Sequence, residues 1–208
     1  MPRVALAAEL AFVLVAFVWR GWLQYRRTGD HGFRGLSGTV GSPEWCGGAL
    51  LILGALAAFA APVSELTGSL QPAAFLNRPL VHALGLAAVT LGCILTILAQ
   101  LQMGASWRVG VDQREVTALV THGLFRYARN PIYTAMLVAF CGLILLVPNP
   151  IAVSGGALAF AGLELHVRLV EEPYLLRVHG EAYRRYARTV GRFLPGLGRF
   201  TGDAASVR

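Results

Sequence analysis

Five long apolar runs constrain the fold of this chain more than any other feature. A helix needs roughly 20 apolar residues to cross about 30 Å of hydrocarbon. Runs of that order cover residues 4–23, 45–63, 79–103, 131–148 and 150–169. Of the 208 residues, 55% are hydrophobic and 14% are charged, which is unlike a soluble domain. The sequence therefore predicts an all-α, polytopic membrane protein with about five transmembrane helices.

The ends of these runs suggest how the chain is organised. The fourth and fifth runs are joined by Val147-Pro148-Asn149-Pro150, which cannot continue a helix, so we expect an antiparallel helical hairpin. The polar tail carries a broken helical stripe of leucines and tyrosines, which predicts a C-terminal interfacial helix against the membrane face. We expect an N-terminal region, 1–103, with three helices and a cytoplasmic loop, and a C-terminal region, 104–208, that holds the site.

Arginine placement predicts the orientation. The chain has eighteen arginines and no lysine, and sixteen of the arginines follow the first run, the third run or the fifth run. Only Arg3 and Arg78 fall on the opposite side. Basic residues near the ends of membrane helices stay in the cytoplasm. We therefore expect an integral protein of a bacterial inner membrane, with the N-terminus outside and the C-terminus cytoplasmic.

The same charges argue against two other kinds of site. The formal charge is +7, but the arginines flank apolar runs, whereas a nucleic-acid binder needs a solvated basic face, so we expect no nucleic-acid partner. Cys46, Cys93 and Cys141 occur singly, without a Cys-x-x-Cys pair or a histidine at ligand spacing. We expect no metal site.

Two polar stretches are candidate sites. In THGLFRYARNPIYTAM, Asn130 precedes Pro131, so an irregular cytoplasmic segment should dock at the mouth of the fourth run. Its rings and free backbone groups suit a flat polar ligand, although a basic anchor with interfacial aromatics explains the segment equally well. Glu171 and Glu172 follow Arg168, and this cluster could hold a zwitterionic ligand. Composition alone favours a solvated charge cluster there.

Three other polar residues in or beside the apolar runs carry weaker signals. Glu9, Glu164 and His166 lie within predicted helices, where an ionisable side chain is costly. We interpret each as an interface position or a contact between helices.

The motifs LVTHGLFRYARNPIYTAM, the proline turn and EEPYLLRVHGEAYRRYARTVGRFLPG, in this order, resemble the isoprenylcysteine carboxyl methyltransferase family and its bacterial relatives. The resemblance covers about residues 107–197. The family pattern has a Leu-Val and Gly-aromatic segment, Arg-His-Pro-x-Tyr, Glu-Glu, Phe-Gly, two tyrosines and a late proline. Here Asn130 replaces the usual histidine, Phe125 replaces a frequent tyrosine, and His179 replaces the phenylalanine. Asparagine cannot titrate near neutral pH, which argues against a general base at that position.

This resemblance implies an integral membrane methyltransferase with S-adenosylmethionine in a cytoplasm-facing pocket. Its acceptor would be a lipophilic small molecule, a lipid or a prenylated substrate that enters from the bilayer, and the reaction would be methylation of a carboxylate oxygen. The family also implies Arg168 for the substrate carboxylate and a cofactor contact for Glu171 or Glu172, and we assign Glu172 to the catalytic site with Arg168. The implied cofactor-binding residues are Thr117, Ala118, Leu119, Val120, Phe125, Asn130, Pro131, Ile132, Tyr133 and Glu171.

Three other functions remain open from the sequence. The chain could be a phospholipid N-methyltransferase, or a membrane reductase that uses a nicotinamide cofactor, because sterol-reductase-like proteins resemble the same C-terminal region. It could also be a non-catalytic membrane protein in which the arginines and glutamates only set the topology. Cofactor binding discriminates among these.

Overall fold

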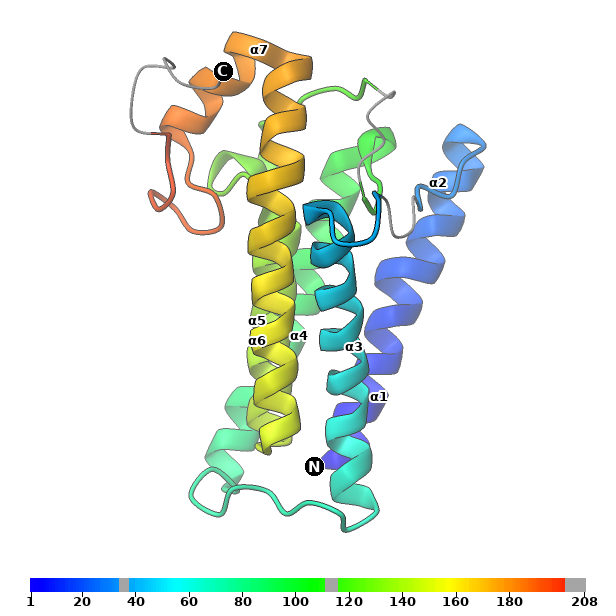
Figure 1. Cartoon of the computed structure of the whole chain (residues 1–208). Coiled ribbons are helices and arrows are strands. Elements are labelled where there is room, and N and C mark those ends of the chain that lie inside the picture. The colour runs from blue at the N-terminus through cyan, green and yellow to red at the C-terminus, as the bar shows by residue number, and fades with distance from the viewer. Residues whose placement is uncertain (34–37, 111–115, 201–208) are drawn as a thin grey trace.

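The computed structural model describes residues 1–33, 38–110 and 116–200. These residues form five helical rods, so the all-helical prediction is confirmed (Figure 1). Two short 3₁₀ helices, η2 (Gly104–Ser106) and η3 (Gly123–Arg126), lie in the connection between the third and fourth rods. The rods are, in chain order, α1 (Pro2–Val13) with η1 (Leu14–Trp19) and α2 (Arg20–Thr28), α3 (Pro43–Leu66), α4 (Pro79–Met103), α5 (Pro131–Leu146), and α6 (Pro150–His166) with η4 (Val167–Glu171) and α7 (Glu172–Thr189).

Helix α5 is the short rod. The other four are long and apolar enough to cross a membrane, whereas α5 has 16 residues. At 1.5 Å per residue it is about 24 Å long. Its end comes before that of the predicted run at 148, because Val147 precedes Pro148 and leaves the helical region with φ −132° and ψ 73°.

The hairpin turn between α5 and α6 lies where the two prolines predict it. Asn149 caps α6 by accepting a hydrogen bond from the Ala152 amide at 3.0 Å. Its side-chain amide donates to the Ala61 carbonyl at 3.1 Å and to Glu65 Oε1 at 2.9 Å, which ties the turn to the end of α3. The polar groups of this buried turn are therefore satisfied by a neighbouring helix.

Small residues pack the rods into two antiparallel pairs, α3 with α6 and α4 with α5. A Cβ placed on Gly54 would lie 2.9 Å from the Ala159 backbone nitrogen, and one on Gly92 would lie 2.6 Å from the Ala139 backbone nitrogen. Close backbone approach through small residues is how helices associate where lipid removes the hydrophobic driving force. The small residues recur at intervals of seven: Gly47, Gly54 and Ala61; Gly85, Gly92 and Ala99; Gly155 and Gly162.

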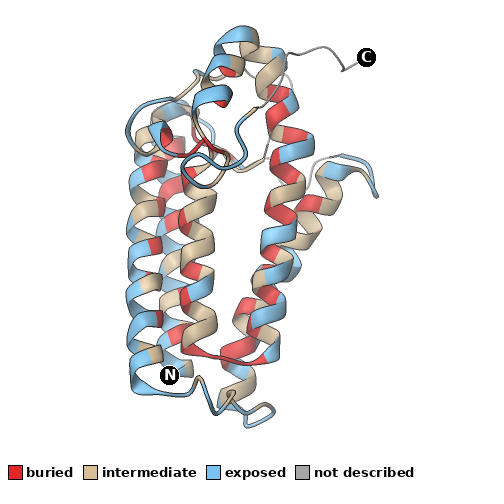
Figure 2. Cartoon of the chain, turned by 90° about the vertical axis from the view of Figure 1, so that its left-hand side faces the viewer, coloured by how far each residue is buried: buried red, intermediate tan, exposed pale blue. Residues whose placement is uncertain are grey.

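Buried positions follow the packed faces of these helices (Figure 2). A cluster that includes Ala5, Ala61, Val89 and Leu146 joins α1 to both helix pairs near the N-terminal end of the bundle. Above this cluster the two pairs enclose a cavity, described below.

The polar connections gather at the other end of the bundle. The loop after α2, the connection from α4 to α5 and the C-terminal segment share the end that carries the C-terminus, and the N-terminus lies at the opposite end (Figure 1). Most of the predicted cytoplasmic arginines belong to these segments. Arg34, Arg114 and Arg208 lie outside the described residues.

The C-terminal helix differs from the prediction of a separate interfacial helix. Helix α6 continues through the π-helical η4 directly into α7, so the fifth rod extends well beyond the predicted boundary at 169. Pro173 removes an amide donor, and the adjacent π-helical turn lets the rod continue despite that loss. The rod changes direction only at Gly180, whose φ of 50° and ψ of −124° suit a residue without a Cβ.

Candidate functional site

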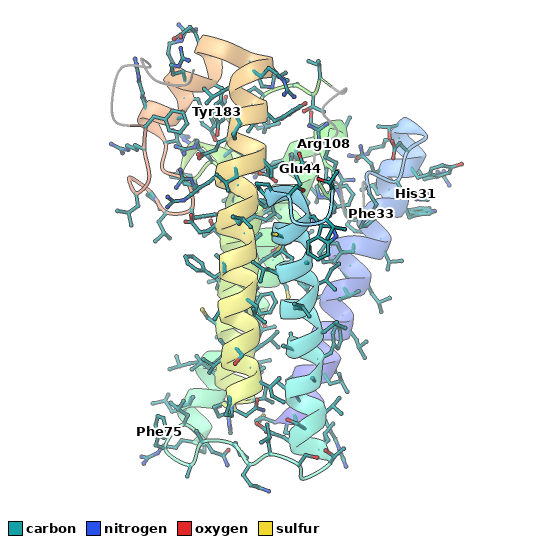
Figure 3. The ribbon with its side chains drawn as sticks, viewed as in Figure 1. His31, Phe33, Glu44, Phe75, Arg108 and Tyr183 are labelled. Atoms are coloured by element: carbon teal, nitrogen blue, oxygen red, sulfur yellow. The ribbon has the colours of Figure 1, made fainter. Side chains whose placement is uncertain are left out.

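A cavity of about 460 Å³ runs from the polar end of the bundle into its apolar interior. This volume lies within the range of about 300–1,000 Å³ that holds small molecules and cofactors. Glu44, Arg108 and Tyr183 line the polar end, and Figure 3 shows them at the same end of the molecule, far from Phe75. Apolar side chains of α1, α3, α4 and α5 line the deeper part. One cavity thus offers a polar mouth and an apolar interior.

The structure brings together all ten residues that the sequence assigns to a cofactor pocket. They come from the connection before α5, from the start of α5 and from η4, segments separated by up to 54 positions between Thr117 and Glu171. These ten lining residues are Thr117, Ala118, Leu119, Val120, Phe125, Asn130, Pro131, Ile132, Tyr133 and Glu171. Their role in binding a cofactor stays a prediction.

Glu171 lines the polar part of the cavity. The Tyr133 hydroxyl donates a hydrogen bond to Glu171 Oε1, and His166 Nε2 lies 3.5 Å from the same oxygen. In an α-helix, residues five apart point to different sides, but the wide π-helical turn η4 brings His166 and Glu171 closer to one face. π-Helical turns occur frequently at functional sites for this reason. The turn thus presents a carboxylate to the cavity.

Glu172 points to a different place and is not among the described residues that line the cavity. Its Oε1 accepts from Arg129 Nη2 at 2.5 Å and from Arg192 Nε at 2.8 Å, and its Oε2 accepts from Arg192 Nη2 at 2.9 Å. The hydrogen bond to Glu172 raises the pKa of the Arg192 guanidinium above its ordinary value. The carboxylate is buried and paired with two guanidinium groups. This ion-pair cluster of Glu172, Arg129 and Arg192, called the clamp below, suits a structural role.

The clamp fastens the C-terminal segment over the start of α5. Arg129 also donates to the carbonyls of Ala187 at 3.0 Å, Val190 at 2.6 Å and Gly198 at 3.0 Å. Both terminal nitrogens of this buried guanidinium thus donate to two acceptors each, while its Nε has no partner among the described residues. The turns after α7 are therefore held by one side chain from the connection before α5.

Asn130 takes part in the same fastening. Its backbone amide donates to the Arg192 carbonyl at 3.0 Å, and its side-chain amide donates to the same oxygen at 3.2 Å. Beside it, the Thr134 hydroxyl donates to the Phe193 carbonyl at 2.7 Å. Asn130 thus lines the cavity while its amide group holds the C-terminal segment. These contacts explain why an amide side chain serves at this position without titrating.

Arg168 lies outside the cavity lining. It donates to Glu164, one helical turn earlier, and its side chain is 57% exposed. Of the described arginines, Arg108 and Arg129 line the cavity. Arg129 is engaged in the clamp, and Arg108 lies over the Tyr174 ring at 5.1 Å. The structure therefore offers Arg108, not Arg168, as the guanidinium at the mouth.

A buried network holds the wall that carries Arg108. Arg20 is fully buried, donates to the Gly104 carbonyl at 2.6 Å and lies 4.5 Å from the Trp107 ring centroid. Gln100 donates to the Ala16 carbonyl at 2.9 Å. Sequence reasoning missed Trp107 and Arg108 as lining residues. Their signal was an aromatic residue followed by a charged one just after the end of the third apolar run.

Comparison with known proteins finds similarity to membrane methyltransferases. The model of the phospholipid methyltransferase family matches residues 80–182. Protein-S-isoprenylcysteine O-methyltransferase from Dictyostelium discoideum is 29% identical over 86 residues, which cover 41% of this chain and 36% of that protein. A probable protein-S-isoprenylcysteine O-methyltransferase from Oryza sativa subsp. japonica is 27% identical over 117 residues, which cover 55% of this chain and 61% of that protein. The chain thus spans less than two thirds of either relative.

A solved structure shares the fold. The eukaryotic intramembrane Ras methyltransferase, isoprenylcysteine carboxyl methyltransferase, aligns with a TM-score of 0.52 at 21% identity, and the alignment covers 77% of this chain and 55% of that one. With four long candidate spans, this chain is an integral membrane protein. The matched region and these relatives show that the chain is similar to phospholipid methyltransferases and to protein-S-isoprenylcysteine O-methyltransferases.

Proposed function

We propose that this protein transfers a methyl group from S-adenosylmethionine to a carboxylate oxygen of a lipophilic acceptor. One observation carries the proposal. Ten residues from separate segments, which the family resemblance assigns to a cofactor pocket, line a single cavity whose mouth is polar and whose interior is apolar. Such a cavity suits a polar cofactor at the mouth and an apolar acceptor chain in the interior.

The groups at the mouth fit S-adenosylmethionine. Glu171 offers a carboxylate to an amino group, a sulfonium or ribose hydroxyls, and charge-assisted hydrogen bonds of this kind are strong. Phe125, Tyr174 and Tyr186 offer ring faces to the adenine. Residues 117–120 are irregular, so their backbone groups are not committed to a helical hydrogen-bond ladder and can be directed at a polar edge. This combination of donors, acceptors and rings matches the chemistry of that cofactor.

When bound, the sulfonium of the cofactor supplies an activated methyl group, so the protein needs mainly to align the reactants and exclude water. Arg108 is the candidate for orienting the acceptor carboxylate, because it lines the mouth where Arg168 does not. Tyr133 holds the Glu171 carboxylate in place through its hydroxyl. A carboxylate nucleophile is already ionised near neutral pH, so no general base is required. The absence of a histidine at position 130 therefore does not argue against this reaction.

Phospholipid N-methylation is the second candidate, and the match to the phospholipid methyltransferase family favours it. The two reactions leave different products. Full-length protein in detergent should be incubated with methyl-labelled S-adenosylmethionine and either a farnesylated cysteine derivative or phosphatidylethanolamine. Carboxylate methylation gives a base-labile ester on the first acceptor, and N-methylation gives a base-stable product on the second.

The outcomes decide the proposal. Ester formation on the farnesylated acceptor supports it, and labelled lipid with a base-stable methyl group replaces it with N-methylation. Binding of a nicotinamide cofactor without binding of S-adenosylmethionine would point to a reductase. Failure to bind either cofactor would favour a non-catalytic role.

A further inference from the structure

Glu9 of α1 lies near the floor of the cavity. Its side chain belongs to the cavity lining, and the residue is 5% exposed. Neither carboxyl oxygen has a hydrogen-bond partner among the described residues. One helical turn earlier, Ala5 packs with Ala61, Val89 and Leu146 in the cluster that closes the floor. The carboxyl oxygens thus make no hydrogen bond to another described helix, so a polar contact between helices does not account for this glutamate.

The position of Glu9 along the bundle can be estimated from helical rise. Glu9 precedes Arg20 by 11 residues, and Arg20 bonds the end of α4 at the polar mouth. On α5, the lining runs from Tyr133 to Leu143. At 1.5 Å per residue both paths give roughly 15 Å. Because the hydrocarbon core is about 30 Å thick, Glu9 lies close to its middle.

A carboxyl group in these surroundings is costly. Burying it without a hydrogen-bond partner is unfavourable in either protonation state. Ionisable side chains within membrane segments are rare and mark binding or transport functions. Phe12, Phe59 and Phe140 line the same cavity, and their rings cannot donate a hydrogen bond to a carboxyl group. A leucine would fill the same position without this cost, so packing alone does not account for a glutamate.

We propose that Glu9 binds a hydrogen-bond-donating group on the chain of the methyl acceptor. The acceptor is then an amphiphile with two polar ends: the carboxylate that is methylated at the mouth, and a hydroxyl or amino group about 15 Å away, separated by an apolar stretch. This inference rests on the proposed function for the position of the methylated group. It adds a second polar group to the substrate class and makes Glu9 a specificity-determining residue.

Fatty acids matched in length test the inference by binding alone. ω-Hydroxydodecanoic acid, ω-aminododecanoic acid and dodecanoic acid have the same carboxylate and the same chain length, and they differ at the far end. Full-length protein purified in detergent should bind at least one of the two substituted acids about five- to tenfold more tightly than dodecanoic acid, the gain expected for one hydrogen bond to a buried carboxyl. The acid that is preferred identifies the donor as a hydroxyl or an amine.

Three variants assign the preference to Glu9. Glu9→Leu should bind all three acids with the affinity that the parent has for dodecanoic acid, whereas Glu9→Gln should keep part of the preference because an amide oxygen still accepts. Thr96→Val is the matched control: its hydroxyl is also buried and unpartnered among the described residues, but it does not line the cavity. It should keep the full preference.

The unliganded stability gives a second readout. Glu9→Leu removes an unpartnered buried carboxyl, so its thermal midpoint should rise by roughly 2–8 °C. A parent protein that binds the three acids equally, or a Glu9→Leu variant that keeps the preference, would overturn the inference. Because the acids are compared without methyl transfer, a parent that shows the preference but does not bind S-adenosylmethionine would contradict the proposed function and leave the Glu9 site standing.

Discussion

Glu171 and Glu172 are neighbours in sequence with different environments. Glu171 faces the cavity with Tyr133 and His166, whereas Glu172 is clamped by Arg129 and Arg192. The sequence marks the pair as unusual, because two carboxylates follow an apolar run. It cannot assign the two roles, because the partners of each lie between 20 and 43 positions away, apart from His166. The π-helical turn that separates their directions has no signature that we recognised in the sequence.

The clamp predicts that the two glutamates respond differently to neutralisation. Glu172→Gln leaves the buried Arg129 guanidinium and the partly buried Arg192 guanidinium without a carboxylate, and breaking a buried ion pair in this way costs about 3 kcal/mol or more. The thermal midpoint in detergent should fall by roughly 6–12 °C. Glu171→Gln should change the unliganded midpoint little, because the amide still accepts from Tyr133. Equal losses from the two variants would show that both carboxylates serve stability.

At the scale of helices, the sequence predicts which helices form better than it predicts which helices pack against each other. Hydropathy and proline positions are local signals, so the rods and the turn at Pro148-Asn149-Pro150 could be anticipated. Which helix pairs with which depends on the faces that carry small residues, and in this chain those recur every seven positions, as in Gly85, Gly92 and Ala99. That spacing was present in the sequence and was missed.

The helix pairing predicts a strong effect at Gly92. A Cβ there would lie 2.6 Å from the Ala139 backbone nitrogen, so Gly92→Ala must push α4 and α5 apart and should cost about 1–3 kcal/mol of stability. Gly156→Ala is the matched control, because its Cβ would meet the flexible end of the Ile144 side chain. Thermal unfolding in detergent compares them. Equal stability of the two variants would contradict the close α4–α5 packing.

For the whole molecule, the bundle places the polar connections and the C-terminal segment at one end, with the cavity mouth among them. Arginine asymmetry predicted this shared end because it depends on charge counts and not on packing. The cavity itself could not be predicted, because it forms between two helix pairs whose partnership was unknown. Glu9 shows the difference most clearly. Its position within the first apolar run was visible in the sequence, but its place in the lining of the cavity was not.

The arginine-rich end predicts the orientation in the membrane. A reporter fused after residue 208 should be active only in the cytoplasm, and one fused before residue 1 only outside, because five spans place the termini on opposite sides. Cysteine labelling at Ser69, in the connection between α3 and α4, provides an internal control and should occur only from outside. A C-terminal reporter that is active outside would contradict the orientation and the cytoplasmic access of the cavity.

The mouth of the cavity should bind S-adenosylmethionine through Glu171. The most direct test is calorimetric titration of the cofactor into full-length protein in detergent, with Glu171→Gln and the control Glu164→Gln, whose carboxylate pairs with Arg168 outside the cavity. Loss of a charge-assisted hydrogen bond costs about 1.5–3 kcal/mol, which is roughly ten- to a hundredfold in affinity. We predict that the parent and Glu164→Gln bind with similar affinity and that Glu171→Gln is weaker by this factor. Equal binding by all three proteins, or no binding by the parent, would contradict the claim.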